Sequence, residues 1–247
     1  MTSGPQAPTA FGLAEAVWPE VPNGATVLVP VGALEQHGPH LPLDTDSVIA
    51  RAVSEAAAAL LGPDVYVAPV LAYGSSGEHQ AFPGTVSIGG DALTLLLVEV
   101  TRSLLTWSDR VVFVNGHGGN IAALSAAVIQ LRREGHEVGW SPCATEHVDA
   151  HAGFTETSLM LHLRPRSVRL RRAQAGNTTP IAQLLPALVE HGVRPLSPNG
   201  VLGDPTGATA REGLRLLKNM ALDVALATRA GLVNHRGMFL VPEVIPT

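Results

Sequence analysis

Short apolar runs, rich in valine, alternate along the chain with longer segments that carry apolar residues at helical spacing. The apolar runs predict strands, the first opening at Val27 and the others at 66–71, 110–115 and 137–145. The longer segments predict helices at 46–62, 92–107, 120–134 and near 208–229, with a short helical turn at 13–17. Because strands and helices alternate, we expect an α/β fold with a mostly parallel sheet.

Composition bears on domain organisation and on partners. We expect residues 1–12 to form a flexible lead and 13–247 to form one domain, because no break in composition divides the chain. Hydrophobic residues make up 46% of the chain and charged residues 15%, which argues against disorder outside the ends. The net charge of −5 predicts neither nucleic acid nor an anionic membrane as a partner. The scarcity of charge favours burial of some surface between subunits of a homo-oligomer.

Targeting signals and cysteine usage predict a cytoplasmic protein. Cys143 is the only cysteine, which excludes an intramolecular disulfide and a thiolate zinc cluster within one chain. The first residues lack the basic start and the apolar stretch of a secretion signal, and no later segment is apolar enough to span a bilayer. We therefore expect a soluble protein in a reducing compartment.

The loop after the first predicted strand, EQHGPHLPLDTD, is dense in side chains that bind metals. They are Glu35, His37, His40, Asp44 and Asp46. Carboxylate and imidazole suit zinc, iron(II) or manganese, and one carboxylate can bridge two cations. The alternatives are a solvated loop, a nucleophile triad with only Ser47 as a candidate, and a phosphate cradle, which would need glycines and a lysine. Because Pro39 and Pro42 make the loop rigid, we favour a metal site.

Similar residues follow two later strands. The second predicted strand leads to Glu78 and His79, and the third leads to His117, Gly118 and Gly119. A single histidine in such a place is more often a core or capping residue. However, ligands gather at the carboxyl ends of parallel strands, so Glu35, His37 and His117 can converge on one crevice.

A second dense cluster follows the fourth predicted strand and comprises Glu146, His147, Asp149, His151 and Glu156. Glu156 has a structural alternative, because Thr155 can cap the next helix and place Glu156 in its first turn. The segment 164–172 is mostly basic. It is typical of a solvated face, although it could also meet an acidic partner or a substrate carboxylate.

The motifs EQHGPHLPLDTD, GEHQAFPGT, NGHGGN and HAGFTETS, in this order, resemble those of the creatininase family of metal-dependent amidohydrolases. The resemblance covers roughly residues 27–229. It implies a single-domain three-layer α/β/α sandwich of the creatininase type. It also implies two divalent ions per subunit, zinc and/or iron(II) or else manganese, and closed ring-like homo-oligomers, commonly hexamers.

The resemblance further implies roles for individual residues. Glu35 and His117 match the ligands of one ion, His37 and Glu156 match those of the other, and Asp46 matches the carboxylate that bridges them. This weakens the helix-cap explanation of Glu156. His151 matches the residue that transfers a proton to the leaving nitrogen. The positions expected to support the ligands or contact substrate are His40, Asp44, Glu78, His79, Gly118, Gly119 and His147.

The chain departs from creatininase itself at two places, and both changes open the pocket. Gly118 and Gly119 stand where that enzyme has Tyr and Glu, and His147 lies near the place of a tryptophan that closes over creatinine. A larger amide, such as the tail of a peptide, therefore fits better than a small cyclic one. Similarity to family members that act on a modified precursor peptide implies release of a C-terminal Val-Tyr dipeptide. The alternatives are a deformylase or amidohydrolase for a small heterocyclic amide, and a non-catalytic protein that binds the precursor peptide.

Overall fold

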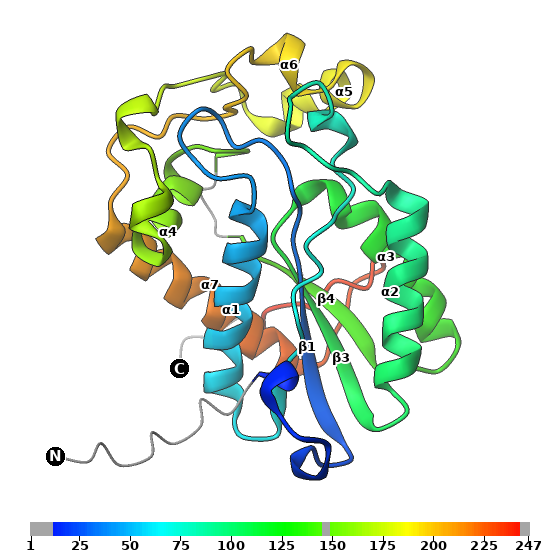
Figure 1. The fold of residues 1–247 in the computed structure, drawn as a ribbon. Coiled ribbons are helices and arrows are strands. Elements are labelled where there is room, and N and C mark those ends of the chain that lie inside the picture. Colours follow the sequence, from blue (N-terminus) through cyan, green and yellow to red (C-terminus); the bar gives the residue numbers. More distant parts are fainter. Residues whose placement is uncertain (1–11, 145–148, 243–247) are drawn as a thin grey trace, which may run out of the picture.

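A parallel sheet forms the centre of the computed structural model, which describes residues 12–144 and 149–242. Its strands are β1 (Ala25–Val31), β2 (Val65–Val67), β3 (Ser108–Asn115) and β4 (Val138–Pro142), in the order β2-β1-β3-β4 (Figure 1). Each neighbouring pair is parallel, and Val29 is in register with Phe113. The predicted second strand ends early, at Val67, because Pro69 has no N–H to donate to the sheet. In the rest of the predicted strand, Leu71 forms an isolated bridge to Val31.

Helices cover both faces of the sheet, so the predicted three-layer α/β/α sandwich is confirmed (Figure 1). One face carries α1 (Thr45–Leu61), α4 (Phe154–Leu163) and α7 (Ala210–Ala230), and the other carries α2 (Gly90–Leu104) and α3 (Ile121–Arg133). The strands bury both of their faces, as the continuous apolar runs predict. Leu28 and Val112 pack toward the α1 side, and Val27 and Phe113 toward the α2 side.

Short elements complete the fold around this sandwich. The 3-10 turns are η1 (Leu13–Glu15), η2 (Trp18–Glu20), η3 (Gly77–His79), η4 (Gly118–Asn120), η5 (Pro165–Ser167) and η6 (Leu170–Arg172). Two further helices, α5 (Ile181–His191) and α6 (Val193–Leu196), lie beyond the end of the sheet where β1 ends (Figure 1). They pack around a small core of Leu184, Leu188, Val193 and Leu202 and contact η3. No described helix is long and apolar enough to cross a membrane.

The strand order creates a topological switch point at one end of the sheet. From β1 the chain crosses to β2 on one side, and it then returns to β3 on the other side of β1. The connections after β1 and β3 therefore diverge, and in open parallel sheets ligands bind at such a switch point. The loops after β1 and β3 are the ones that carry Glu35, His37 and His117.

Candidate metal centre

The loop after β1 buries its charged side chains instead of exposing them to water. Glu35 and His37 are both 0% exposed, and Asp46, in the first turn of α1, is 1% exposed. Gly32 begins the loop, where a β-carbon would collide with Ser47 of α1. Burial of several ionisable groups is costly unless they pair with one another or bind a cation.

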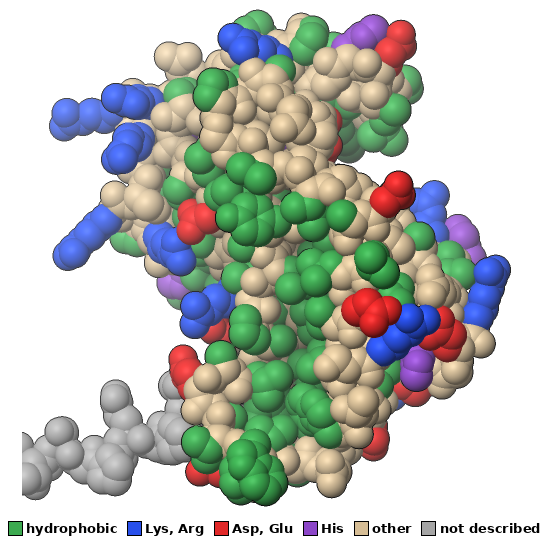
Figure 2. All heavy atoms as spheres, turned by 45° about the vertical axis from the view of Figure 1, so that its right-hand side comes forward, with side chains coloured by type: hydrophobic (Ala, Val, Ile, Leu, Met, Phe, Trp, Pro, Cys, Tyr) green, Lys and Arg blue, Asp and Glu red, His purple; other side chains and the backbone are tan. Residues whose placement is uncertain are grey.

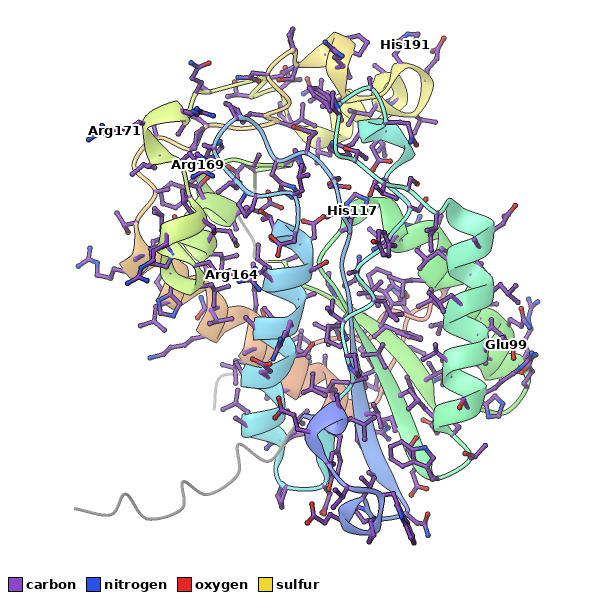
Figure 3. All side chains as sticks on the ribbon, in the orientation of Figure 1. Glu99, His117, Arg164, Arg169, Arg171 and His191 are labelled. Carbon is purple, nitrogen blue, oxygen red and sulfur yellow. The ribbon has the colours of Figure 1, made fainter. Side chains whose placement is uncertain are left out.

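One group of side chains combines Glu35, Asp46 and His117, whose possible ligand atoms lie within 4.8 Å of one another. His117 lies two residues beyond the end of β3, and the Asn115 side chain donates to its carbonyl at 2.7 Å. His117 Nε2 is 3.2 Å from Glu35 Oε2, and its Nδ1 is 3.5 Å from Asp46 Oδ2. In Figure 3, His117 lies beyond the end of the sheet, near the end of β1.

A second group surrounds His37 on the other side of Asp46. His37 Nε2 is 2.9 Å from Asp46 Oδ1 and 3.8 Å from Glu156 Oε2. Glu156 and His37 form a group of possible ligands with His151, again within 4.8 Å of one another. The two oxygens of Asp46 thus face different imidazoles, the arrangement that a bridging carboxylate requires.

The structure therefore brings together all five residues predicted as ligands, from positions more than a hundred residues apart. Glu156 does lie in the first turn of α4, but Thr155 does not cap this helix, as the structural alternative for Glu156 required. The cap position is held by Gly153, and the N–H of Thr155 donates to Asp149 Oδ1 at 3.2 Å. Glu156 Oε2 instead accepts the N–H of Ala152 at 2.6 Å, and Ala152 adopts a φ of 53° that side chains rarely tolerate.

The electrostatics of the cluster fit a cation. Glu35 Oε1, Glu35 Oε2 and Asp46 Oδ2 are buried and accept no hydrogen bond from the described residues. Burial would raise the pKa of Glu35, but the imidazoles of His117 and His79 lower it well below its ordinary value. Burial raises the pKa of Asp46 and raises that of Glu156 to about 7. Anionic oxygens without donors, set among imidazoles, are a donor set that divalent metals satisfy.

The two imidazoles nearest the carboxylates would carry protons when no metal is bound. Burial opposes protonation, yet Asp46 and Glu156 raise the pKa of His37 to about 10. Burial likewise opposes protonation of His117, but Glu35 and Asp46 raise its pKa to about 10. A bound cation would take the place of these protons.

Several of the other predicted site residues lie at the centre. His79 Nε2 is 3.3 Å from Glu35 Oε1, and Glu35, His79 and His151 form a third group of possible ligands. Glu78 Oε1 is 3.5 Å from His117 Nε2. At Gly119 a β-carbon would collide with His117 Nε2, whereas Gly118 has open space around it.

Two further predicted residues, His40 and Asp44, make their contacts away from the proposed ligand groups. His40 is buried, with its Nε2 2.8 Å from Thr157 Oγ1, and burial lowers its pKa to about 4. Asp44 points away and pairs with Arg164 at 2.7 Å, which joins the start of α1 to the end of α4. Residues 145–148, which include Glu146 and His147, lie outside the described residues.

Sequence reasoning missed residues that hold the centre through hydrogen bonds. Asn120 donates from its side chain to the Gly32 carbonyl at 3.0 Å and accepts the Ser75 N–H at 2.9 Å, so it joins three loops. The side chain of Gln36 contacts both His79 and His151. Asn120 lies in the motif NGHGGN and Gln36 lies between Glu35 and His37. Amide side chains are not typical metal ligands, so their residue type does not indicate a role in the centre.

Comparisons with known proteins agree with this geometry. The family model described as creatininase, creatinine amidohydrolase, matches residues 14–227. The chain belongs to the creatininase family. As a member of that family it is a metal-dependent hydrolase, and the family resemblance predicted from the sequence is confirmed.

Relatives of this creatininase-family protein include proteins described as mycofactocin precursor peptide peptidase. The one from Mycolicibacterium smegmatis is 56% identical over 198 residues, covering 78% of this chain and 80% of the relative. The one from Mycobacterium tuberculosis strain H37Rv is 49% identical over 240 residues, covering 94% and 96%. A more distant relative, from Methanothermobacter thermautotrophicus, is described as a deformylase of a formylamino-pyrimidine monophosphate and is 35% identical over 135 residues.

Solved creatininase structures share the fold. A structure described as "Creatininase Mn" has a TM-score of 0.72 and 27% sequence identity, covering 90% of this chain and 98% of that chain. That description names manganese, and the centre described above has the carboxylates and imidazoles to bind a divalent cation. This creatininase-family protein therefore carries a divalent metal site at the switch point of its sheet.

Proposed function

We propose that this protein is a dinuclear metal-dependent peptidase that removes a C-terminal dipeptide, Val-Tyr, from the modified mycofactocin precursor peptide. The observation that carries the proposal is the pair of ligand groups that share Asp46, with carboxylate oxygens that accept no hydrogen bond from the described residues. The relatives described as mycofactocin precursor peptide peptidase support the choice of substrate.

The five central side chains divide between the two cations. Glu35 and His117 would hold one, His37 and Glu156 would hold the other, and Asp46 would contact both. Bound zinc, iron(II) or manganese would make water a better nucleophile and polarise the carbonyl of the scissile amide. The chain itself fixes the spacing, because Asp46 is held in the first turn of α1.

His151 would deliver the proton that the leaving nitrogen needs. Its ring is 6% exposed and stacks at a tilt against His37 and His79, with centroids 4.3 and 4.4 Å away. Hydrolysis adds one water across the amide, so the departing nitrogen must gain a proton as its bond to carbon breaks.

The arginine segment 164–172 supports a substrate with a free carboxylate. It carries five arginines, and the sequence from 157 to 189 contains no aspartate or glutamate. Among the described residues, Arg164 forms the one ion pair of this segment, with Asp44. The N–H of Arg169 donates to the His40 carbonyl at 2.8 Å, so the segment touches the loop that carries the ligands. Figure 3 shows Arg164 between α4 and α1, Arg169 near the turns after α4, and Arg171 pointing outward from the molecule.

An exposed apolar band supports assembly into a closed homo-oligomer. Figure 2 shows hydrophobic side chains gathered down one face of the molecule. Exposed apolar residues include Trp18 at 86% and Tyr73 at 51%. Light scattering after size-exclusion chromatography would give the number of subunits.

Mass spectrometry of the precursor peptide, after incubation with metal-loaded protein, tests the proposed function. We expect loss of the mass of the dipeptide, and no loss with the Asp46→Asn variant. Arg169→Glu should raise KM for the peptide and leave kcat unchanged, while Arg133→Glu, at the far end of α3, should change neither.

The second candidate is hydrolysis of a small amide, favoured by the deformylase relative. Peptide and a small formamide should be supplied side by side, since the two functions share every proposed ligand. Turnover of the formamide alone would establish the second candidate. Binding of the peptide without turnover of either compound would instead establish a non-catalytic precursor-binding protein.

A further inference from the structure

Gln36 lies between two of the proposed ligands, and its buried side chain contacts two histidines of the centre. Its Nε2 is 2.9 Å from His79 Nδ1 and 3.0 Å from His151 Nε2. A neutral amide is a poor ligand beside carboxylates and imidazoles, so these contacts indicate a different role.

Two backbone groups fix which end of the Gln36 amide carries the hydrogens. The Gly38 N–H can only donate, and it donates to Gln36 Oε1 at 2.9 Å. The Gly200 carbonyl can only accept, and it accepts from Gln36 Nε2 at 2.9 Å. One of the two amide hydrogens is thereby used, which leaves one for a histidine.

The backbone carbonyl of Gln36 decides which histidine receives that hydrogen. It lies 2.7 Å from His151 Nε2 and can only accept, so Nε2 of His151 carries the hydrogen. The remaining amide hydrogen therefore goes to His79 Nδ1. The ring hydrogen of His79 is then on Nε2, which faces Glu35 Oε1 at 3.3 Å.

We propose that Gln36 is a positioning residue that holds His79 and His151 as Nε2–H tautomers and leaves Nδ1 of His151 as the acceptor facing the centre. This Nδ1 is 3.6 Å from Glu35 Oε1. In the proposed reaction, on which this step rests, His151 first takes a proton at Nδ1 as an O–H bond of the attacking water breaks. It then gives that proton to the leaving nitrogen as the C–N bond breaks. Throughout, the Nε2–H of His151 donates to the backbone carbonyl of Gln36.

The segment 199–203 holds this arrangement from the other side. The N–H and C=O of Leu202 pair with the C=O and N–H of His151 at 2.9 and 3.0 Å. Gly200 adopts a φ of 81°, and a β-carbon there would collide with Gln36 Oε1. The first glycine of the motif NGVLGDPTG, Gly200, is therefore explained by its positive φ and by its close approach to the Gln36 amide.

The test combines kinetics with nitrogen-15 NMR of zinc-loaded protein labelled at histidine. Long-range couplings in such spectra show which ring nitrogen carries hydrogen. In the wild type we expect Nε2–H for both His79 and His151. In Gln36→Met, which keeps the volume and removes the donor, we expect His79 to show a mixture of tautomers. We also expect kcat to fall about 10- to 100-fold at unchanged KM and zinc content. Gln130→Met, at an exposed position on α3, should change none of these readouts.

A hydrogen on Nδ1 of His151 in the wild type would overturn the proposal, and so would a single unchanged His79 tautomer in Gln36→Met. If Gln36→Met does not fold, Gly200→Ala provides the same test. Its β-carbon would push the side-chain amide of Gln36 out of its position, although the residue at position 36 is unchanged. The spectra need no substrate. Failure of the wild type to cleave the peptide would therefore overturn the proposed function without affecting this assignment.

Discussion

Replacing Asp46 by Asn should remove most of the stabilisation that bound metal gives to the protein. Asp46 is 1% exposed, and its two oxygens face His37 at 2.9 Å and His117 at 3.5 Å. Asn offers one oxygen and one NH₂ group in the same volume, so it cannot contact two cations. In the metal-free protein the change also removes the buried ion pair between Asp46 Oδ1 and protonated His37, so it lowers stability there as well.

The size of the effect follows from the binding of two ions. At free metal about 100 times above Kd, each ion adds about 2.7 kcal/mol to stability, and two independent ions add about 5.4 kcal/mol. In a chain of 247 residues, 1 kcal/mol shifts Tm by roughly 2–4 °C. Chelation should therefore lower the Tm of the wild type by about 11–22 °C.

Scanning calorimetry with and without a chelator measures this directly. The Tm of the Asp46→Asn variant should shift little on chelation, and its metal-free Tm should lie below that of the metal-free wild type because the ion pair with His37 is lost. Asp91→Asn, in the first turn of α2, is the matched control and should keep the full shift. A wild-type Tm that chelation does not move, or a full shift in Asp46→Asn, would refute the reasoning.

Three further predictions concern the same centre. Metal affinity should fall as pH decreases. In the metal-free protein His37 and His117 are protonated below their pKa of about 10, and metal binding must release these protons. Titration calorimetry in buffers of different ionisation enthalpy counts the released protons. Gly119→Ala should weaken metal binding at least tenfold, since its β-carbon meets His117 Nε2, while Gly118→Ala, in open space, should bind metal normally; competition with a coloured chelator distinguishes them. His151→Ala should lower kcat about 100-fold or more with unchanged metal content; undiminished turnover would exclude it from proton transfer.

The fold and the family were predictable because their signals are local. Continuous valine-rich runs, such as 110–115, predict strands buried on both faces, and they form the centre of the sheet. The ligand candidates could be selected because they are carboxylates and imidazoles placed just after strands or at the start of helices, and the carboxyl ends of parallel strands share one edge. Their assignment as ligands remains a prediction.

Other features depend on geometry that spacing does not reveal. Asp44 is the N-cap residue of α1 and Asp46 lies in its first turn, so the two side chains leave the backbone in different directions. Asp46 therefore points into the centre while Asp44 reaches Arg164. Gln36 donates a hydrogen bond to the carbonyl of Gly200, which is 164 positions away, and no local sequence pattern connects the two residues. Thr155 has a residue type that is common at N-caps, but α4 begins two residues earlier than capping by Thr155 requires.

Anomalous diffraction from crystals of the metal-loaded protein, recorded at the absorption edge of the bound metal, tests the central claim most directly. We expect two peaks per chain, about 3.5–4 Å apart. One should lie next to Glu35, Asp46 and His117, and the other next to His37, Asp46 and Glu156. A single peak held by Glu35, His79 and His151, the third group of possible ligands, would contradict it.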